Sequence, residues 1–219
     1  MSGRGVVLTG GGARAAYHVG VLRAIADMFP DTGYPFDVIT GTSAGAINAM
    51  SLASGGDIFR HNVSNLEHLW SELDMSHVYR SGSVAIMRNM TRVARKILSG
   101  GAQSRPLSLL NNSPLREFLE REIDFDAMHA AVSEGKIRAV GVNACGYATG
   151  QNVCFFEGDA SLESWNAGQR AGSPTQLTLD HVMASSAIPT LFPPVSINRE
   201  YFGDGVTRQS AHVSPALRL

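Results

Sequence analysis

Two segments near the N-terminus share one order: a short apolar run, a glycine-containing turn and a helical pattern. The first run, residues 6–9, meets three consecutive glycines, after which apolar residues recur at helical spacing as far as residue 29. The second run, residues 35–40, meets Gly-Thr-Ser-Ala-Gly at residues 41–45, which leads into small and apolar helix formers. Parallel strands need a crossover, which a helix usually supplies. The order therefore predicts an α/β fold with a parallel sheet and helices packed on its faces.

The turn at residues 41–45 matches the Gly-x-Ser-x-Gly nucleophile elbow, in which a serine occupies a strained turn between a strand and a helix. Gly41 and Gly45 suit it because a side chain at either position would collide with the neighbouring strand or helix. Thr42 and Ala44 fill the variable positions. The alternative is that Thr42 or Ser43 simply caps a buried helix. The preceding strand and the following helix favour Ser43 as a nucleophile.

Gly10, Gly11 and Gly12 are placed to form an oxyanion site. Neighbouring parallel strands end at the same edge of a sheet, and a glycine turn lets backbone N–H groups approach a developing negative charge. The alternative is dinucleotide binding, because this turn nearly spells Gly-x-Gly-x-x-Gly. Ala15 replaces the last glycine of that pattern, and no acidic residue stands at the expected spacing. No lysine follows as in a phosphate-binding Walker loop.

Composition limits the class of protein. The chain has 219 residues, of which 44% are hydrophobic, enough for one sizeable core. With 18 Lys and Arg against 19 Asp and Glu, nothing indicates a nucleic-acid partner. Cys145 and Cys154 lack metal-site spacing, so we expect free, partly buried thiols and no metal site. The first residues lack the basic and apolar regions of a signal peptide, and no apolar run reaches about 18 residues, so we expect a cytoplasmic protein.

The rest of the chain alternates helical and extended patterns. Residues 57–131 are mainly helical and more polar, which predicts a helical insertion or lid. Residues 136–144 and 151–156 predict two strands around a turn. A loop is expected at 158–176 and a short helix at 178–186, before brief strands among proline turns.

Asp204 is the candidate partner of Ser43. It follows the apolar residues Tyr201 and Phe202 and lies between two glycines, although the same residues are typical of an ordinary Asp-Gly turn. An alternative is a triad of Ser43, an aspartate at 180 or 204, and His212, as in α/β-hydrolases. The early position of the elbow in the chain argues against that triad.

Five segments together resemble the patatin-like phospholipases, in the family's order and over nearly the whole chain. They are residues 10–14, 16–25, 41–45, 184–195 and 204–205. The resemblance implies a three-layer patatin-like fold with a mainly parallel central sheet flanked by helices. Because patatin-like domains generally continue further, it also implies a single domain over 1–219 that is truncated at its C-terminus.

The resemblance further implies a Ser-Asp dyad without histidine. Ser43 would be the nucleophile and Asp204 the base, while the glycine turn with Arg14 would form the oxyanion site. The implied reaction is hydrolysis of acyl esters in lipids, of the phospholipase A or lysophospholipase type, through an acyl-enzyme on Ser43 and without metal or organic cofactor. A catalytically silent lipid-binding protein remains an alternative.

Physical chemistry adds three expectations. An apolar setting from Tyr201, Phe202 and Phe192 would raise the pKa of Asp204 and make it a better base. Residues 84–98 carry an apolar stripe with basic residues mostly elsewhere, which predicts either peripheral membrane contact or a lid helix packed on the core. Finally, an acyl pocket is expected from four apolar residues: Phe155, Phe156, Leu191 and Phe192.

Overall fold

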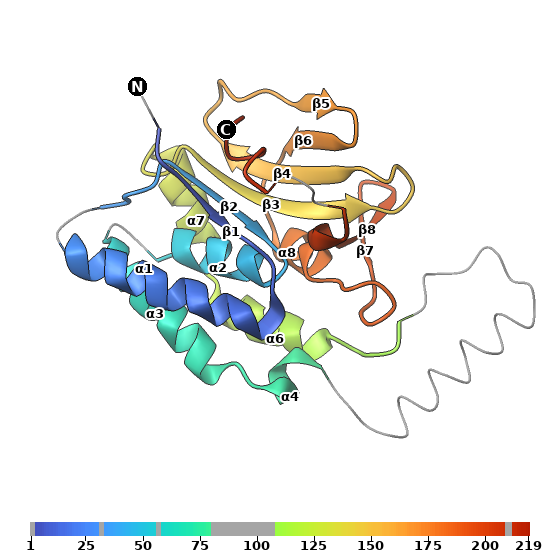
Figure 1. The fold of residues 1–219 in the computed structure, drawn as a ribbon, viewed down its shortest axis with the longest axis horizontal. Helices are drawn as coiled ribbons and strands as arrows, with labels where there is room; N and C mark the ends of the chain where they lie inside the picture. The colour runs from blue at the N-terminus through green and yellow to red at the C-terminus, as the bar shows by residue number, and fades with distance from the viewer. Residues whose placement is uncertain (1–2, 31–32, 56–57, 80–107, 209–211) are drawn as a thin grey trace, which may run out of the picture.

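The computed structural model describes residues 3–30, 33–55, 58–79, 108–208 and 212–219 (Figure 1). Its strands are β1 (Gly5–Leu8), β2 (Val38–Thr42), β3 (Ala139–Gly146), β4 (Asn152–Gly158), β5 (Trp165–Ala167), β6 (Arg170–Pro174), β7 (Val195–Ile197) and β8 (Glu200–Asp204). Its α-helices are α1 (Ala16–Met28), α2 (Ala44–Ala53), α3 (Phe59–Glu72), α4 (Met75–Val78), α6 (Ser113–Glu122), α7 (Phe125–Ser133) and α8 (Leu179–Ser185). Two 3-10 helices, η1 (Gly12–Ala15) and η2 (Gly205–Thr207), follow β1 and β8. The segment 84–98, predicted to contact a membrane or form a lid, lies outside the described residues.

The strands form one mixed sheet in the order β1-β2-β3-β4-β6-β5, with β8 on β3 and β7 on β8. β1, β2 and β3 run parallel, and so do β4 and β6, whereas the other pairs are antiparallel. The predicted α/β class is confirmed. The sheet is less parallel than predicted, because tight connections reverse the chain between β3 and β4, β5 and β6, and β7 and β8.

The prediction of a loop at residues 158–176 is wrong, because this segment contains the strands β5 and β6. β6 pairs in parallel with β4, and β5 pairs antiparallel with β6. The ring of Trp165 stacks on Phe156 and lies directly over Gly172, where a Cβ would approach within 2.1 Å of it. Gly172 therefore lets an aromatic ring lie against β6 at close range.

One face of the sheet carries the helical layer (Figure 1). Helix α2 has buried residues all along its length, as expected of a helix between a sheet and an outer layer. α1 and α3 pack against each other, and α3 also packs on α2. Six helices contribute to one large core with β1 to β4: α1, α2, α3, α6, α7 and α8. This layer includes α1 and α2, the helices that follow the parallel strands β1 and β2.

The opposite face carries a smaller apolar cluster in place of a described helix. Leu219, in the C-terminal segment 212–219, packs there with Val38, Ala139, Cys154 and Phe156. Both cysteines are free, as predicted, and they are almost fully buried where partial burial was expected. Burial raises the pKa of the Cys154 thiol to about 12, so it stays protonated and unreactive.

The described part of the segment 57–131 is helical, but α3 belongs to the main core. Its side chains Val63, Leu66 and Leu69 are almost fully buried there. α7 contacts both α2 and β4. α3 and α7 therefore share one core with α1 and α2, and the predicted insertion or lid over residues 57–131 stays a prediction. Across the described ranges, none of the helices is both long and apolar enough to cross a bilayer.

Candidate active site

Ser43 lies at the junction of β2 and α2 with strained backbone angles, φ 55° and ψ −128°. Few residues with a Cβ adopt this conformation, and it persists only where the surroundings enforce it. Both flanking glycines are required by close approach. A Cβ at Gly41 would lie 2.3 Å from the carbonyl oxygen of Gly45, and a Cβ at Gly45 would lie 2.0 Å from that of Leu8. The turn thus has the geometry of a nucleophile elbow.

The hydroxyl of Ser43 donates a hydrogen bond of 2.7 Å to Oδ2 of Asp204. Ser43 is 7% exposed and Asp204 is 5% exposed. The sheet explains why residues so far apart in sequence meet: β2 pairs with β3, and β3 pairs with β8 with Asp204 opposite Ala144. The structure therefore joins the two residues that the sequence singled out as nucleophile and base.

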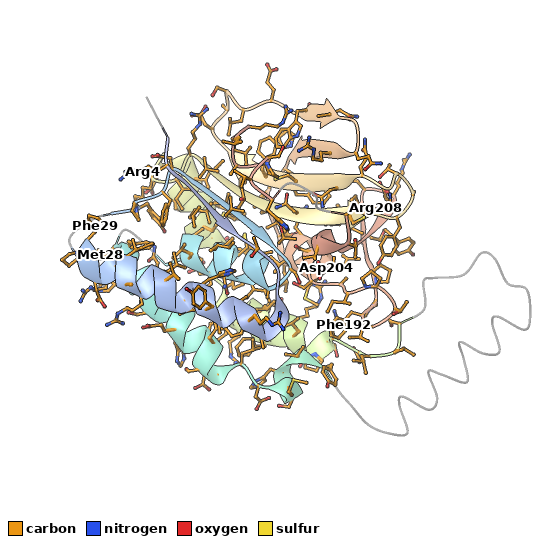
Figure 2. All side chains as sticks on the ribbon, in the orientation of Figure 1. Arg4, Met28, Phe29, Phe192, Asp204 and Arg208 are labelled. Carbon is orange, nitrogen blue, oxygen red and sulfur yellow. The ribbon has the colours of Figure 1, made fainter. Side chains whose placement is uncertain are left out.

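The Asp204 carboxyl is held in an environment that favours its protonated form. Burial raises its pKa above the ordinary value, and hydrogen bonds from the Val206 N–H and the Ser43 hydroxyl lower it by less. Phe202 and Phe192 are buried as expected, but Tyr201 is exposed and lies at the surface. Asp204 and Phe192 lie on one side of the molecule, at the opposite end of α1 from Met28 (Figure 2). A raised pKa makes Asp204 a stronger base than an aspartate in water.

Ser185 is a site residue that sequence reasoning missed. Its hydroxyl is fully buried, accepts a hydrogen bond of 2.8 Å from the Ser43 N–H and donates one of 2.6 Å to the carbonyl of Asn143. Two residues further on, the Ala187 carbonyl accepts a 2.9 Å hydrogen bond from the Asp204 N–H. The segment 185–187 therefore holds the backbone of both Ser43 and Asp204. Nothing in the sequence around these residues distinguishes Ser185 from the serine after it.

The glycine turn after β1 lies against Ser43. A Cβ at Gly10 would be 2.4 Å from Cγ2 of Val206 and 3.0 Å from the Cβ of Ser43. Gly12 has φ 55°, which favours glycine, and lines a cavity together with Ser43. Gly11 accepts a hydrogen bond from the Arg14 N–H within η1. Gly10 thus lies against Ser43, and Gly12 lines the same cavity.

Arg14 is exposed and is not among the residues that line this cavity. The turn that carries it is anchored from the interior by Asn48, which is fully buried. The Asn48 amide donates a hydrogen bond of 3.0 Å to the Ala15 carbonyl and accepts one of 2.7 Å from the Trp70 indole. Asn48 therefore fixes η1 to α2 and to a wall of the cavity.

A cavity of about 540 Å³ opens beside Ser43. Most of its lining is apolar, and includes Ile47, Leu73, Val78, Leu115, Leu191 and Phe192. Leu191 and Phe192 line it as predicted, but Phe155 and Phe156 do not. Phe155 and Phe156 are neighbours on β4, a strand in the interior of the sheet. Phe155 packs in the large core, and Phe156 packs in the smaller cluster on the opposite face. The walls of the cavity include residues of α2, α3, α4 and α6.

The alternative triad finds no support in this geometry. Asp180 is half exposed and forms an ion pair with Arg116. No described residue lining the cavity is a histidine. His212 begins the C-terminal segment, whose Leu219 packs on the opposite face of the sheet.

Within the described ranges, no group of three or more His, Cys, Asp or Glu side chains could hold a metal ion.

Comparison with known proteins agrees with this architecture. The family model of the patatin-like phospholipases matches residues 6–217. A cGAMP-activated phospholipase of Escherichia coli strain TW11681 is 29% identical over 209 residues, which are 90% of this chain and 50% of that protein. The chain thus spans half the length of this relative.

Two further relatives match over shorter stretches. A patatin-like phospholipase domain-containing protein of Caenorhabditis elegans is 54% identical over 43 residues, 20% of this chain and 3% of its own. A lysophospholipase of Aspergillus terreus is 44% identical over 54 residues, 25% of this chain and 3% of its own. Since the family model covers nearly the whole chain, the protein belongs to the patatin-like phospholipase family.

Proposed function

We propose that this protein hydrolyses acyl ester bonds in lipids, with Ser43 as nucleophile and Asp204 as its base. The observation that carries the proposal is the 2.7 Å hydrogen bond from the Ser43 hydroxyl to Asp204, formed at the wall of an apolar cavity. Family membership supports lipid ester hydrolysis in general. The two residues add a specific mechanism, and the cavity adds a place for the acyl chain.

In the proposed first step, Oγ of Ser43 attacks the acyl carbonyl carbon while Oδ2 of Asp204 takes the hydroxyl proton. The tetrahedral intermediate collapses as the carbon–oxygen bond to the alcohol breaks, and Asp204 returns the proton to that oxygen. The acyl group then remains on Ser43 as an ester. A water molecule repeats the sequence, giving up its proton to Asp204, and releases the fatty acid with the Ser43 hydroxyl restored.

The negative charge on the carbonyl oxygen would be stabilised by the glycine turn at residues 10–12 and by the N-terminus of α2. The turn lies against Ser43, and the first turn of a helix leaves N–H groups without intrahelical partners. Arg14, on the adjacent η1, would add positive charge from outside the cavity. We assign this oxyanion role to Gly10, Gly11, Gly12 and Arg14 as part of the proposal.

The proposed substrate is a phospholipid or lysophospholipid presented at a lipid surface. Three apolar residues of the cavity lining are also exposed: Met75 at 64%, Ile188 at 42% and Leu191 at 36%. Apolar side chains at the rim of a cavity can contact lipid while the acyl chain enters. The peripheral contact predicted for the segment 84–98 belongs to the same proposal.

Hydrolysis of a nitrophenyl butyrate ester and of a lysophosphatidylcholine tests the proposal. Ser43→Ala and Asp204→Asn should each lower kcat/KM by about 1,000-fold or more, as removal of a nucleophile or its base does. His212→Ala should stay within about twofold of the parent protein. Loss in His212→Ala would favour a Ser-Asp-His triad. A parent protein that hydrolyses neither ester would instead indicate a lipid-binding protein.

A further inference from the structure

Two asparagine side chains are buried on the face of the sheet opposite the helical layer that holds the cavity. Asn143 on β3 is 1% exposed, and Asn152 on β4 is 4% exposed. Side chains alternate between the two faces of a strand, and the neighbours Val142 and Val153 pack in the large core with the helices. Neither asparagine is among the residues that line the cavity. Any effect of the two on the reaction must therefore pass through other residues.

Asn143 holds the end of β2, directly before Ser43. Its Nδ2 donates one hydrogen bond of 3.1 Å to the Gly41 carbonyl and another of 3.1 Å to Oγ1 of Thr42. The strained backbone of Ser43 persists only if its surroundings enforce it. Asn143 thus fixes the two residues that lead into the strained turn.

Asn152 holds the turn directly after Asp204. Its Nδ2 donates a hydrogen bond of 2.9 Å to the Gly205 carbonyl. Gly205 begins η2, and the N–H of the next residue, Val206, donates a 2.9 Å hydrogen bond to Oδ1 of Asp204. A Cβ at Gly205 would lie 2.4 Å from the carbonyl oxygen of Asn143, so this turn is in close contact with β3. One asparagine therefore holds the turn of the nucleophile, and the other holds the turn of the base.

Asn143 occupies its position at a cost in stability. Its Oδ1 is buried and has no hydrogen-bond partner among the described residues. A buried polar group without a partner costs about 1–3 kcal/mol. The other side chains of β3 are those of alanine, valine and cysteine. The contribution of Asn143 to this structure therefore lies in the two hydrogen bonds that its amide donates.

We infer that Asn143 and Asn152 are positioning residues, which keep the Ser43 hydroxyl within hydrogen-bonding distance of Asp204 from the far face of the sheet. The inference rests on the proposed function. A displacement of about 1 Å between reacting groups can slow a reaction about 100-fold. Loss of either asparagine should therefore slow the step in which Asp204 takes the Ser43 proton, and should leave binding of the ester nearly unchanged.

The rate at which a fluorophosphonate probe labels Ser43 tests the inference when Asn143→Ala and Asn152→Ala are each made in two backgrounds. In the parent protein, each should slow labelling about 10–100-fold, while KM for nitrophenyl butyrate stays within about threefold. In Asp204→Asn, each should slow labelling less than about threefold, because groups that act as a unit have non-additive effects. General damage to the turn at Ser43 would slow labelling in both backgrounds.

Two isosteric variants of β2 give a matched comparison. Thr42→Val removes one acceptor of the Asn143 amide and should slow labelling about 3–10-fold, as loss of one hydrogen bond does. Thr40→Val is the control, because the Thr40 hydroxyl is buried without a partner among the described residues. Its labelling rate should stay within about twofold of the parent rate, and its Tm should not fall. If an alanine variant lacks a cooperative unfolding transition, the Thr42→Val rate in the two backgrounds decides the question.

Three results would overturn the inference: equal slowing with and without the Asp204 carboxylate, equal slowing in Thr40→Val and Thr42→Val, or parent rates in both alanine variants. If the parent protein is labelled at Ser43 and hydrolyses the ester, such a result leaves the proposed function standing. A parent protein that is neither labelled nor active contradicts the proposed function and this inference together.

Discussion

The backbone N–H of Ser43 donates a hydrogen bond of 2.8 Å to the hydroxyl of Ser185, 142 residues further along the chain. The same hydroxyl donates to the carbonyl of Asn143 on β3, the strand that pairs with the strand carrying Asp204. Ser185 therefore connects the strained turn at Ser43 to the part of the sheet that positions Asp204. This positioning role predicts that replacing Ser185 changes both activity and stability.

Ser185→Ala should lower kcat about 10–100-fold with little change in KM, because small displacements of reacting groups are costly. The free energy of unfolding should fall by about 1–3 kcal/mol, since the Ser43 N–H loses a buried partner. Ester kinetics and urea unfolding check both effects. Ser133→Ala is the matched control, because that hydroxyl caps an exposed helix end and should affect neither. Equal losses of kcat in the two variants would contradict the assigned role.

Asp204→Asn should raise Tm at neutral pH while abolishing activity. Burial raises the pKa of Asp204 in the folded protein, so at pH values between 3.8 and the raised value the folded state holds a proton that the unfolded chain has lost. Stability contributed by this group is therefore present below the ordinary value of 3.8 and is lost as pH rises through the raised value.

Thermal melts of the parent and Asp204→Asn across acidic and neutral pH measure that difference. The advantage of the variant should be greatest at neutral pH and should vanish as pH falls toward 3.8. Parent activity should fall over the same interval, because a protonated Asp204 cannot accept the Ser43 proton. If Asp204→Asn is less stable than the parent protein, and by the same amount at neutral and at acidic pH, then burial does not destabilise the ionised Asp204 carboxylate.

Gly10→Ala should lower kcat about 10–100-fold by forcing the glycine turn away from the nucleophile. The added Cβ would lie 2.4 Å from Cγ2 of Val206, so one of the two must move. Adding Val206→Ala removes that methyl group and should restore part of the activity, which a double-mutant cycle measures as a coupling energy. Additive losses in the double variant would mean that Val206 is not the group that Gly10 accommodates.

Gly45→Ala and Gly20→Ala should change stability in opposite directions. A Cβ at Gly45 would lie 2.0 Å from a backbone carbonyl, which cannot give way as a side chain does, so the free energy of unfolding should fall by about 3 kcal/mol or more. Gly20 lies on the exposed face of α1 with open space around it, and alanine there should stabilise by about 0.5–1 kcal/mol. Urea unfolding of both variants measures the difference, and a tolerated Gly45→Ala would contradict the close packing of the elbow.

The sequence predicts the N-terminal half of the site well, because local patterns decide it. The order of strand, turn and helix predicts that the turns at residues 10–12 and 41–45 lie at one edge of the sheet. The structure has both turns at that edge. Asp204 could be singled out by its two glycines, but only the antiparallel pairing of β8 with β3 shows that it reaches Ser43. Such pairing depends on long-range contacts that no local pattern encodes.

Features set by the end of a helix or by tertiary packing could not be predicted. Ser185 and Ser186 are adjacent and identical, and the register of α8 decides that one binds Ser43 while the other lines the cavity. β5 and β6 form from a glycine-rich segment because β4 offers a strand to pair with. Phe155 and Phe156 looked suitable for an acyl pocket, but a strand inside the sheet buries both faces.

The central claim is that Asp204 activates Ser43, and the most direct test is the rate at which a fluorophosphonate probe labels Ser43 in the parent protein and in Asp204→Asn, with the labelled peptide identified by mass spectrometry. We predict labelling on Ser43, falling at acidic pH as Asp204 is protonated, and a rate at least about 100-fold slower in Asp204→Asn at neutral pH. Labelling of Asp204→Asn at the parent rate, or labelling at another serine, would contradict the account.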